Sequence, residues 1–167
     1  MPAKHCVHGL FKAFGSAGIE YPFVRARVYV EGELRGTVEF LVDTGAGASL
    51  LAYRDLLTLN IPPMLRGMPR RTAVGIGGAV PTVLLRKPVR LELLDAAGAG
   101  EPIVIVLDGI DCEDPDAVRG QMRSRSRRAK SAVMAKPSLL GWDALRGLEV
   151  IISYIGEKRV LLCESRV

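Results

Sequence analysis

Residues 40–46 read Phe-Leu-Val-Asp-Thr-Gly-Ala, an apolar run that leads straight into an acidic residue and a tight turn. The run predicts the end of a buried strand, and a carboxylate placed there is costly unless it is paired or used in chemistry. Asp43 is therefore the first candidate for catalysis, as a general acid or base. Thr44 adds a short hydroxyl, and Gly45 permits a tight turn and the close approach of another backbone. The segment occurs once in 167 residues, so chemistry that needs two such carboxylates requires two chains.

Two later segments could work together with this loop. Residues 75–78 read Gly-Ile-Gly-Gly between two strand-like runs, a pattern that predicts a hairpin with a glycine-rich tip. Residues 139–145 read Leu-Leu-Gly-Trp-Asp-Ala-Leu. Asp143 in this segment suits the N-cap of a short helix, or a role in fixing a loop. Trp142, the one tryptophan of the chain, is expected in the core.

The elements that must position these segments are mostly short strands. Apolar and polar residues alternate over residues 22–30, which predicts a half-buried strand. A turn at 31–33 leads into a second strand at 37–42, and this hairpin delivers Asp43 to its loop. The further expected elements are strands at 49–51, 70–74, 79–85, 89–94, 103–107, 149–155 and 158–163 and a short helix at 52–59. Many short strands with one or two short helices predict a mainly-β fold, built as a barrel or a sandwich.

The three segments, in this order, resemble the retropepsin-like aspartic proteases, the single-domain family that includes the retroviral proteases and their bacterial and cellular relatives. The resemblance covers residues 23–164. It implies a closed β-barrel of the acid-protease type and a homodimer in which two copies of Asp43 face each other. Like charges a few ångströms apart cannot both ionise easily, so the pair would share one proton. One carboxylate would activate a water and the other would donate a proton to the scissile carbonyl of a polypeptide substrate, with no cofactor and no metal.

The resemblance also implies roles for the residues around Asp43. Thr44 would hydrogen-bond across the two chains, Gly45 would shape the catalytic loop, and the glycine-rich hairpin would close over substrate as a flap. The implied substrate-binding residues are Ala46, Gly47, Gly75, Ile76, Gly77 and Gly78. Two features depart from the retroviral members, because residues 46–48 contain no acid and Trp142 stands where those members have arginine. The acid and the arginine pair with each other in those proteases, so the two losses are consistent with one another.

Other interpretations of the same residues remain open. Asp43 could be a structural turn residue, and the protein would then be a non-proteolytic, dimeric peptide-binding or scaffold domain of the same fold. Asp108-Gly109 after the strand-like run 103–107 could be a second half-site in a single chain, but it lacks the Thr-Gly pair. Residues 45–49, Gly-Ala-Gly-Ala-Ser, lack the lysine and the third glycine of phosphate-binding loops. We favour the catalytic interpretation because the three segments occur together.

The chain is expected to form an N-terminal tail over residues 1–20 and one protease-like domain over residues 21–167. A charged loop insertion is expected at about 108–137, where residues 119–136 hold seven Arg and Lys side chains and no acid. This run has no aromatic residue that could stack on bases. We therefore expect a solvated loop and no nucleic-acid partner. A nucleic-acid-binding alternative would predict an affinity that falls steeply with salt.

The three cysteines, Cys6, Cys112 and Cys163, match no zinc or redox spacing, and their odd number favours a reducing compartment. The His-Cys-Val-His run at residues 5–8 has no fourth ligand nearby, so no metal site is expected. No apolar run approaches the ~20 residues that cross a bilayer. Residues 1–18 lack the apolar centre of a secretory signal. These features predict a cytoplasmic protein with no membrane partner.

Overall fold

The computed structural model of the protein describes residues 4–15, 17–75, 78–123 and 126–165. The strands are β1 (Cys6–His8), β2 (Leu10–Ala13), β3 (Glu20–Val30), β4 (Glu33–Val42), β5 (Leu50–Leu51), β6 (Arg70–Gly75), β7 (Gly78–Leu85), β8 (Val89–Leu94), β9 (Ile103–Leu107), β10 (Ile110–Glu113), β11 (Ser138–Leu140), β12 (Leu148–Ser153) and β13 (Arg159–Glu164). The helices are α1 (Tyr53–Thr58), the 3₁₀ helix η1 (Pro62–Leu65), α2 (Pro115–Arg123), α3 (Arg127–Met134) and α4 (Trp142–Leu145). Strands make up 47% of the protein and helices 20%, which confirms the expected mainly-β class.

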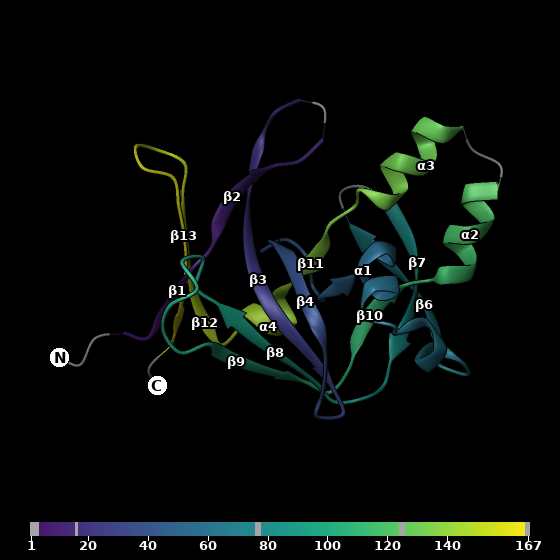
Figure 1. Cartoon of the computed structure of the whole chain (residues 1–167), viewed down its shortest axis with the longest axis horizontal. Helices are drawn as coiled ribbons and strands as arrows, with labels where there is room; N and C mark the ends of the chain where they lie inside the picture. The colour runs from purple at the N-terminus through teal and green to yellow at the C-terminus, as the bar shows by residue number, and fades with distance from the viewer. Residues whose placement is uncertain (1–3, 16, 76–77, 124–125, 166–167) are drawn as a thin grey trace.

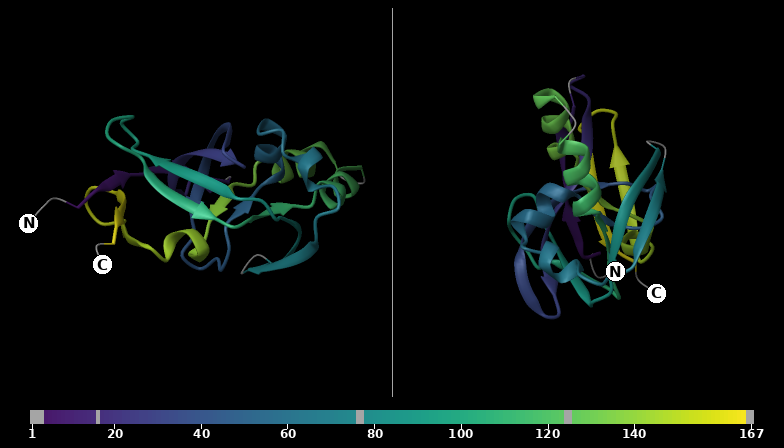
Figure 2. Two further views of the ribbon diagram at one scale, coloured as in Figure 1. Left: turned by 90° about the horizontal axis from the view of Figure 1, so that it is seen from below. Right: turned by 90° about the vertical axis from the view of Figure 1, so that its right-hand side faces the viewer.

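The strands form two sheets. The larger has the order β6-β7-β10-β5-β11-β4-β3-β8-β9, with β2 added beside β3, and the smaller has the order β1-β13-β12. Among the described strands no pairing joins β6 to β9, so the expected closed barrel is not confirmed. The smaller sheet and both termini lie at one end of the molecule, and α2 and α3 lie at the other (Figures 1 and 2). None of the helices in the described part of the chain is long and apolar enough to cross a membrane.

The β3–β4 hairpin leads to the candidate catalytic loop and confirms the prediction from alternation. Glu31 and Gly32 form its turn with φ angles of 52° and 82°. A two-residue hairpin turn that matches the twist of the strands needs such positive φ angles. Every second side chain of β3 enters the core at 0% exposure, namely Val24, Ala26, Val28 and Val30. This burial sets the register of β4, and so the point at which the chain leaves the sheet at Asp43.

Residues 6–8 and 10–13 form strands and not a tail, contrary to the sequence-based expectation for residues 1–20. β1 pairs with β13, and β2 pairs with β3. The backbone N–H of His8 also donates to the Asp95 carboxylate at 2.8 Å. Strands of three and four residues carry too little periodicity to be recognised, and their partners lie far along the chain.

A disulfide joins Cys6 to Cys163 across the β1–β13 pair. The sequence analysis expected reduced cysteines, so this pairing differs from that expectation. Disulfides persist in oxidising compartments. Cys112 remains a free, buried thiol, and desolvation by burial raises its pKa. The cytoplasmic location stays a prediction.

Where the structure describes it, the charged segment at 108–137 is also not a loop. It contains β10, which pairs with β7 and β5, followed by α2 and α3. Val118 and Val133, each 4% exposed, pack with Tyr53 of α1, so the two helices are docked on the domain by a small apolar cluster. Each helix buries few apolar side chains among many basic ones, which left only a weak periodic signal in the sequence.

Candidate functional site

The candidate catalytic loop, residues 43–49, joins two strands that flank a third. β11 pairs in parallel with β4 on one side and in antiparallel fashion with β5 on the other. The loop therefore leaves β4, passes the end of β11 and returns as β5. The backbone N–H of Asp43 donates to the carbonyl oxygen of Leu140 at 3.1 Å, which fixes the start of the loop against β11.

The Asp43 carboxylate shapes the turn that follows it. Its Oδ1 accepts a hydrogen bond from the Gly45 N–H at 3.0 Å, and the Asp43 carbonyl oxygen accepts one from the Ala46 N–H at 3.2 Å. An aspartate that caps its own turn in this way holds the side chain in one orientation. Asp43 is half-buried, whereas Thr44, Gly45 and Gly47 are exposed. The loop thus presents an oriented carboxylate at an open surface.

A buried serine fastens the far end of the loop. Ser49 is 0% exposed, and its hydroxyl donates to Asp143 Oδ1 at 2.6 Å while accepting from the Gly141 N–H at 3.0 Å. The same carboxylate oxygen also accepts the backbone N–H groups of Ser49 and Ala144, each at 2.8 Å. Asp143 therefore fixes the loop, which is one of the two roles expected for it from the sequence. It is not the N-cap, since α4 starts at Trp142 and its N-cap is Gly141.

Gly141 allows the loop and α4 to touch. A Cβ at this position would lie 2.5 Å from the Ala48 carbonyl carbon and oxygen, closer than real Cβ atoms approach backbone. Beside it, the Trp142 N–H donates to the Ala46 carbonyl oxygen at 2.8 Å. The Trp142 side chain is 58% exposed, so the expectation that it lies in the core is wrong. The short helix α4 buries Ala144 and leaves the tryptophan beside the loop at the surface.

The expected glycine-rich hairpin is formed by β6 and β7, with Gly75 paired to Gly78. Ile76 and Gly77 lie outside the described residues. Gly78 has a φ of 105°, a conformation that disfavours other residues. At its base the hairpin is held by Arg71, whose guanidinium contacts both carboxylate oxygens of Asp111 at 3.0 and 2.9 Å. Among the described residues, no hydrogen bond joins this hairpin to the catalytic loop.

Asp108, the candidate for a second half-site within one chain, is exposed after β9. In the sheet, β3 and β8 separate β9 from the strand that carries Asp43. Its neighbour Gly109 has a packing role, because a Cβ there would lie 2.6 Å from the carbonyl oxygen of Leu85. Close packing against β7 thus accounts for the glycine of the Asp-Gly sequence without catalysis.

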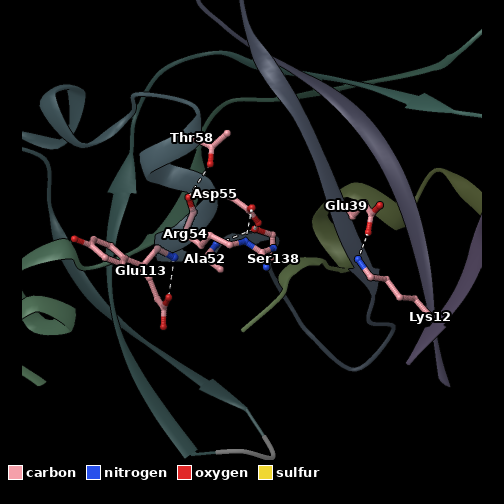
Figure 3. A network of polar contacts seen from close by, with 9 residues as sticks. Lys12, Glu39, Ala52, Arg54, Asp55, Thr58, Glu113 and Ser138 are labelled. Carbon is pink, nitrogen blue, oxygen red and sulfur yellow. Dashed lines mark hydrogen bonds and ion pairs between the residues drawn. The ribbon is translucent and has the colours of Figure 1, made fainter. Parts of the chain in front are cut away.

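A second buried serine–aspartate pair lies away from the loop and has nearly the same geometry. Ser138 is 0% exposed, donates to Asp55 Oδ2 at 2.6 Å and accepts from the Ala52 N–H at 2.9 Å. Figure 3 shows this pair at the start of α1, where the Tyr53 N–H also donates to Glu113 at 2.8 Å. These contacts join α1 to β11 and β10. Sequence reasoning missed them because each links residues that are distant in the chain.

No group of three or more His, Cys, Asp or Glu side chains that could hold a metal ion occurs within residues 4–15, 17–75, 78–123 and 126–165. Two possible ligands of the His-Cys-Val-His run have other contacts. His5 contacts the Glu101 carbonyl oxygen at 2.9 Å, and Cys6 is in the disulfide.

Comparison with known proteins returned similar solved structures. No family model and no curated protein matches the sequence. A retropepsin-like aspartic protease from Rickettsia conorii has a TM-score of 0.49 and 17% identity, over 98% of this chain and 97% of that one. The retroviral protease-like domain of Ddi1 from Leishmania major has a TM-score of 0.34 and 16% identity, over 84% of this chain and 94% of that one. Both names agree with the resemblance seen in the sequence.

Proposed function

We propose that the protein is an aspartic endopeptidase that acts as a homodimer, with one Asp43 from each chain. The observation that carries the proposal is the state of this carboxylate. Its Oδ1 is held by the Gly45 N–H, and its Oδ2 has no hydrogen-bond partner among the described residues. A carboxylate that is oriented in this way, with one oxygen free at an open loop, is available to a water molecule or to a second carboxyl group.

Two copies of Asp43 brought together would share one proton, because two adjacent carboxylates cannot both ionise easily. The ionised carboxylate takes a proton from a water whose oxygen bonds to the scissile carbonyl carbon, while the protonated one gives its proton to the carbonyl oxygen. The C–N bond then breaks. The first carboxyl group returns its proton to the leaving nitrogen, and the second takes one from a hydroxyl of the intermediate. The pair is restored to its starting protonation state.

The supporting roles in this proposal follow the loop geometry. Exposed Thr44 is free to meet its counterpart in a partner chain, and the Gly45–Gly47 turn leaves room for a substrate backbone. The β6–β7 hairpin would close over an extended polypeptide, which would lie as a strand between hairpin and loop.

A non-proteolytic, dimeric peptide-binding or scaffold domain is the second candidate. One observation favours it: the Ser49–Asp143 contacts and the close approach at Gly141 give the loop a structural role that needs no catalysis. Such a domain would bind peptides with Asp43 replaced by Asn and would cleave nothing.

The test is cleavage of casein from about pH 3 to 8 by wild type, Asp43→Asn and Asp108→Asn, with sedimentation at the assay concentration. Asparagine keeps an Oδ1 that can accept the Gly45 N–H, so the loop is retained while the ionisable group is lost. We expect Asp43→Asn to lower the rate by about 10²–10⁴-fold and Asp108→Asn to leave it unchanged. The rate should fall at the alkaline end, where the dyad loses its shared proton.

Three outcomes would contradict this proposal. Loss of cleavage in Asp108→Asn would place a second half-site in the same chain. Cleavage by a species that sediments only as a monomer would exclude the dimer. If the folded wild type and Asp43→Asn both bind peptides equally and neither cuts them, the protein is the peptide-binding domain instead.

A further inference from the structure

A cleft of about 640 Å³ lies outside the catalytic loop, between η1, the start of β6 and the start of α2. Its apolar lining includes Pro62, Leu65 and Met68. Its polar lining is dominated by arginine, and this combination of an apolar wall and a cationic rim is unused by the proposed catalysis.

The arginines of the cleft are arranged around one acidic centre. Arg70 contacts Asp114 at 3.2 Å and Asp116 at 2.7 Å, and Arg119 contacts the other oxygen of Asp116 at 2.6 Å. Arg66 lines the same cleft, is exposed, and has no partner among the described residues. Three guanidinium groups thus face two carboxylates, and the cleft keeps a net positive charge.

The positive surface continues along α2. Arg123 lies four residues after Arg119, one helical turn away on the same side of the helix. It is exposed, and its side chain has no partner in the described part of the chain. α2 itself is held in place by Val118, which packs with Tyr53. The guanidinium groups of Arg119 and Arg123 therefore lie on a helix that is packed against the rest of the domain.

We propose that this cleft binds an acidic segment of a polypeptide, with an apolar side chain of that segment against Met68 and its carboxylates on Arg66 and Arg123. Guanidinium groups favour carboxylates because their N–H groups match the two oxygens of the acid. The apolar lining gives a polypeptide a second point of attachment through a side chain.

A nucleic acid fits the same cleft less well. The lining residues include no aromatic side chain for bases to stack on. Asp114 and Asp116 also stand within the cleft, where they would repel a continuous row of phosphates. An acidic polypeptide can place neutral residues at those points.

The site would act as a docking surface for substrates of the proposed peptidase, and in that sense its biological role rests on the proposed function. Binding itself does not depend on cleavage. It can be measured in the Asp43→Asn background, where the probe is not cut, so failure of the docking site and failure of the peptidase are distinguishable.

The experiment measures fluorescence anisotropy of a labelled Asp/Glu-rich peptide containing a single leucine. Three versions of the full chain are compared, and all carry Asp43→Asn. The first has no other change, and the second, the cleft variant, adds Arg66→Glu and Arg123→Glu. The third adds Arg86→Glu and Arg159→Glu as a matched control. Arg86 and Arg159 are also exposed without described partners, so both double variants change net charge equally. Since none of the four arginines holds a described ion pair, folding should be retained, and circular dichroism checks this.

We expect the cleft variant to raise Kd about tenfold for each guanidinium lost, and the control variant to change it about twofold or less, because distant charges are screened. Replacing the peptide leucine with serine should also weaken binding, and a lysine-rich version should not bind. Equal weakening by both double variants would overturn the site, since it would indicate general charge attraction. Absence of peptide binding, or tighter binding of oligo(dT) that is lost in the cleft variant, would overturn it as well.

Discussion

Replacing Ser49 with alanine should loosen the candidate catalytic loop, residues 43–49, without changing Asp43. The substitution removes the hydroxyl that donates to Asp143 at 2.6 Å and leaves the buried Gly141 N–H without its acceptor at 3.0 Å. The backbone N–H of residue 49 still donates to Asp143.

The magnitude follows from these two contacts. A hydrogen bond to a charged group contributes about 1.5–3 kcal/mol, and an unsatisfied buried N–H costs about 1–3 kcal/mol. Because the surviving contacts to Asp143 keep part of the network, we expect the free energy of unfolding to fall by about 2–4 kcal/mol. For a chain of 167 residues each kcal/mol lowers Tm by about 2–4 °C, so the shift should be measurable.

The control is Ser138→Ala, which removes a serine of equal burial with the same donated and accepted bonds at 2.6 and 2.9 Å. Urea unfolding should give similar losses of stability for the two variants. Only Ser49→Ala should also reduce peptide cleavage under conditions where the protein stays folded. It should also change the fluorescence of the exposed Trp142, whose backbone N–H donates to the Ala46 carbonyl oxygen in the loop.

A loss of less than about 0.5 kcal/mol for Ser49→Ala would contradict the stabilising role of the serine, since surface-like substitutions fall in that range. Impaired cleavage and altered fluorescence in Ser138→Ala, as large as in Ser49→Ala, would contradict a role specific to the loop. In the first case the network would contribute nothing to stability. In the second, the loss would reflect general destabilisation of the fold.

Two further predictions concern the loop and the N-terminal strand. Gly141→Ala would place a Cβ 2.5 Å from the loop backbone, so it should abolish cleavage and lower the stability measured by thermal unfolding. Gly147→Ala is the control and should do neither, because its Cβ would have nothing within 4 Å. Equal effects of the two substitutions would contradict the role of the close approach at Gly141. β1 should be most protected from amide exchange between the ordinary pKa values of aspartate and histidine, 3.8 and 6.5. The pKa of Asp95 is lowered by a β1 backbone N–H that donates to it, so that contribution is present above 3.8 and is lost as pH falls through the lowered pKa. The pKa of His5 is raised by its hydrogen bond to the Glu101 carbonyl. The contribution of His5 to stability is therefore present below pH 6.5 and is lost as pH rises through the raised pKa. Exchange protection of β1 that does not vary with pH would contradict the contributions of both Asp95 and His5.

Much of the candidate site could be predicted from local sequence. The alternation along β3, the turn at Glu31 and Gly32 and the apolar run before Asp43 each act over a few residues. Such patterns can be recognised in a sequence because side-chain alternation and turn conformation depend on residues that are neighbours in the chain. The β6–β7 hairpin was predicted for the same reason, from its paired strands and glycines.

Other features depended on contacts that no local pattern encodes. The Cys6–Cys163 disulfide spans 157 residues, and Ser49 meets Asp143 across 94. The exposure of Trp142 follows from how α4 packs and not from its residue type, since large aromatic side chains are usually buried.

The amino-acid sequence alone showed where an aspartate ends a buried strand, that the fold is rich in short strands, and that one chain holds one Asp-Thr-Gly segment. The position of β11 between β4 and β5, the contacts of Ser49 with Asp143, and the docking of α2 and α3 became visible only in the folded structure. The physical reason is the range of the interactions. Periodicity and turn propensity act along the chain, whereas burial and hydrogen bonding between distant segments exist only once those segments have been brought together.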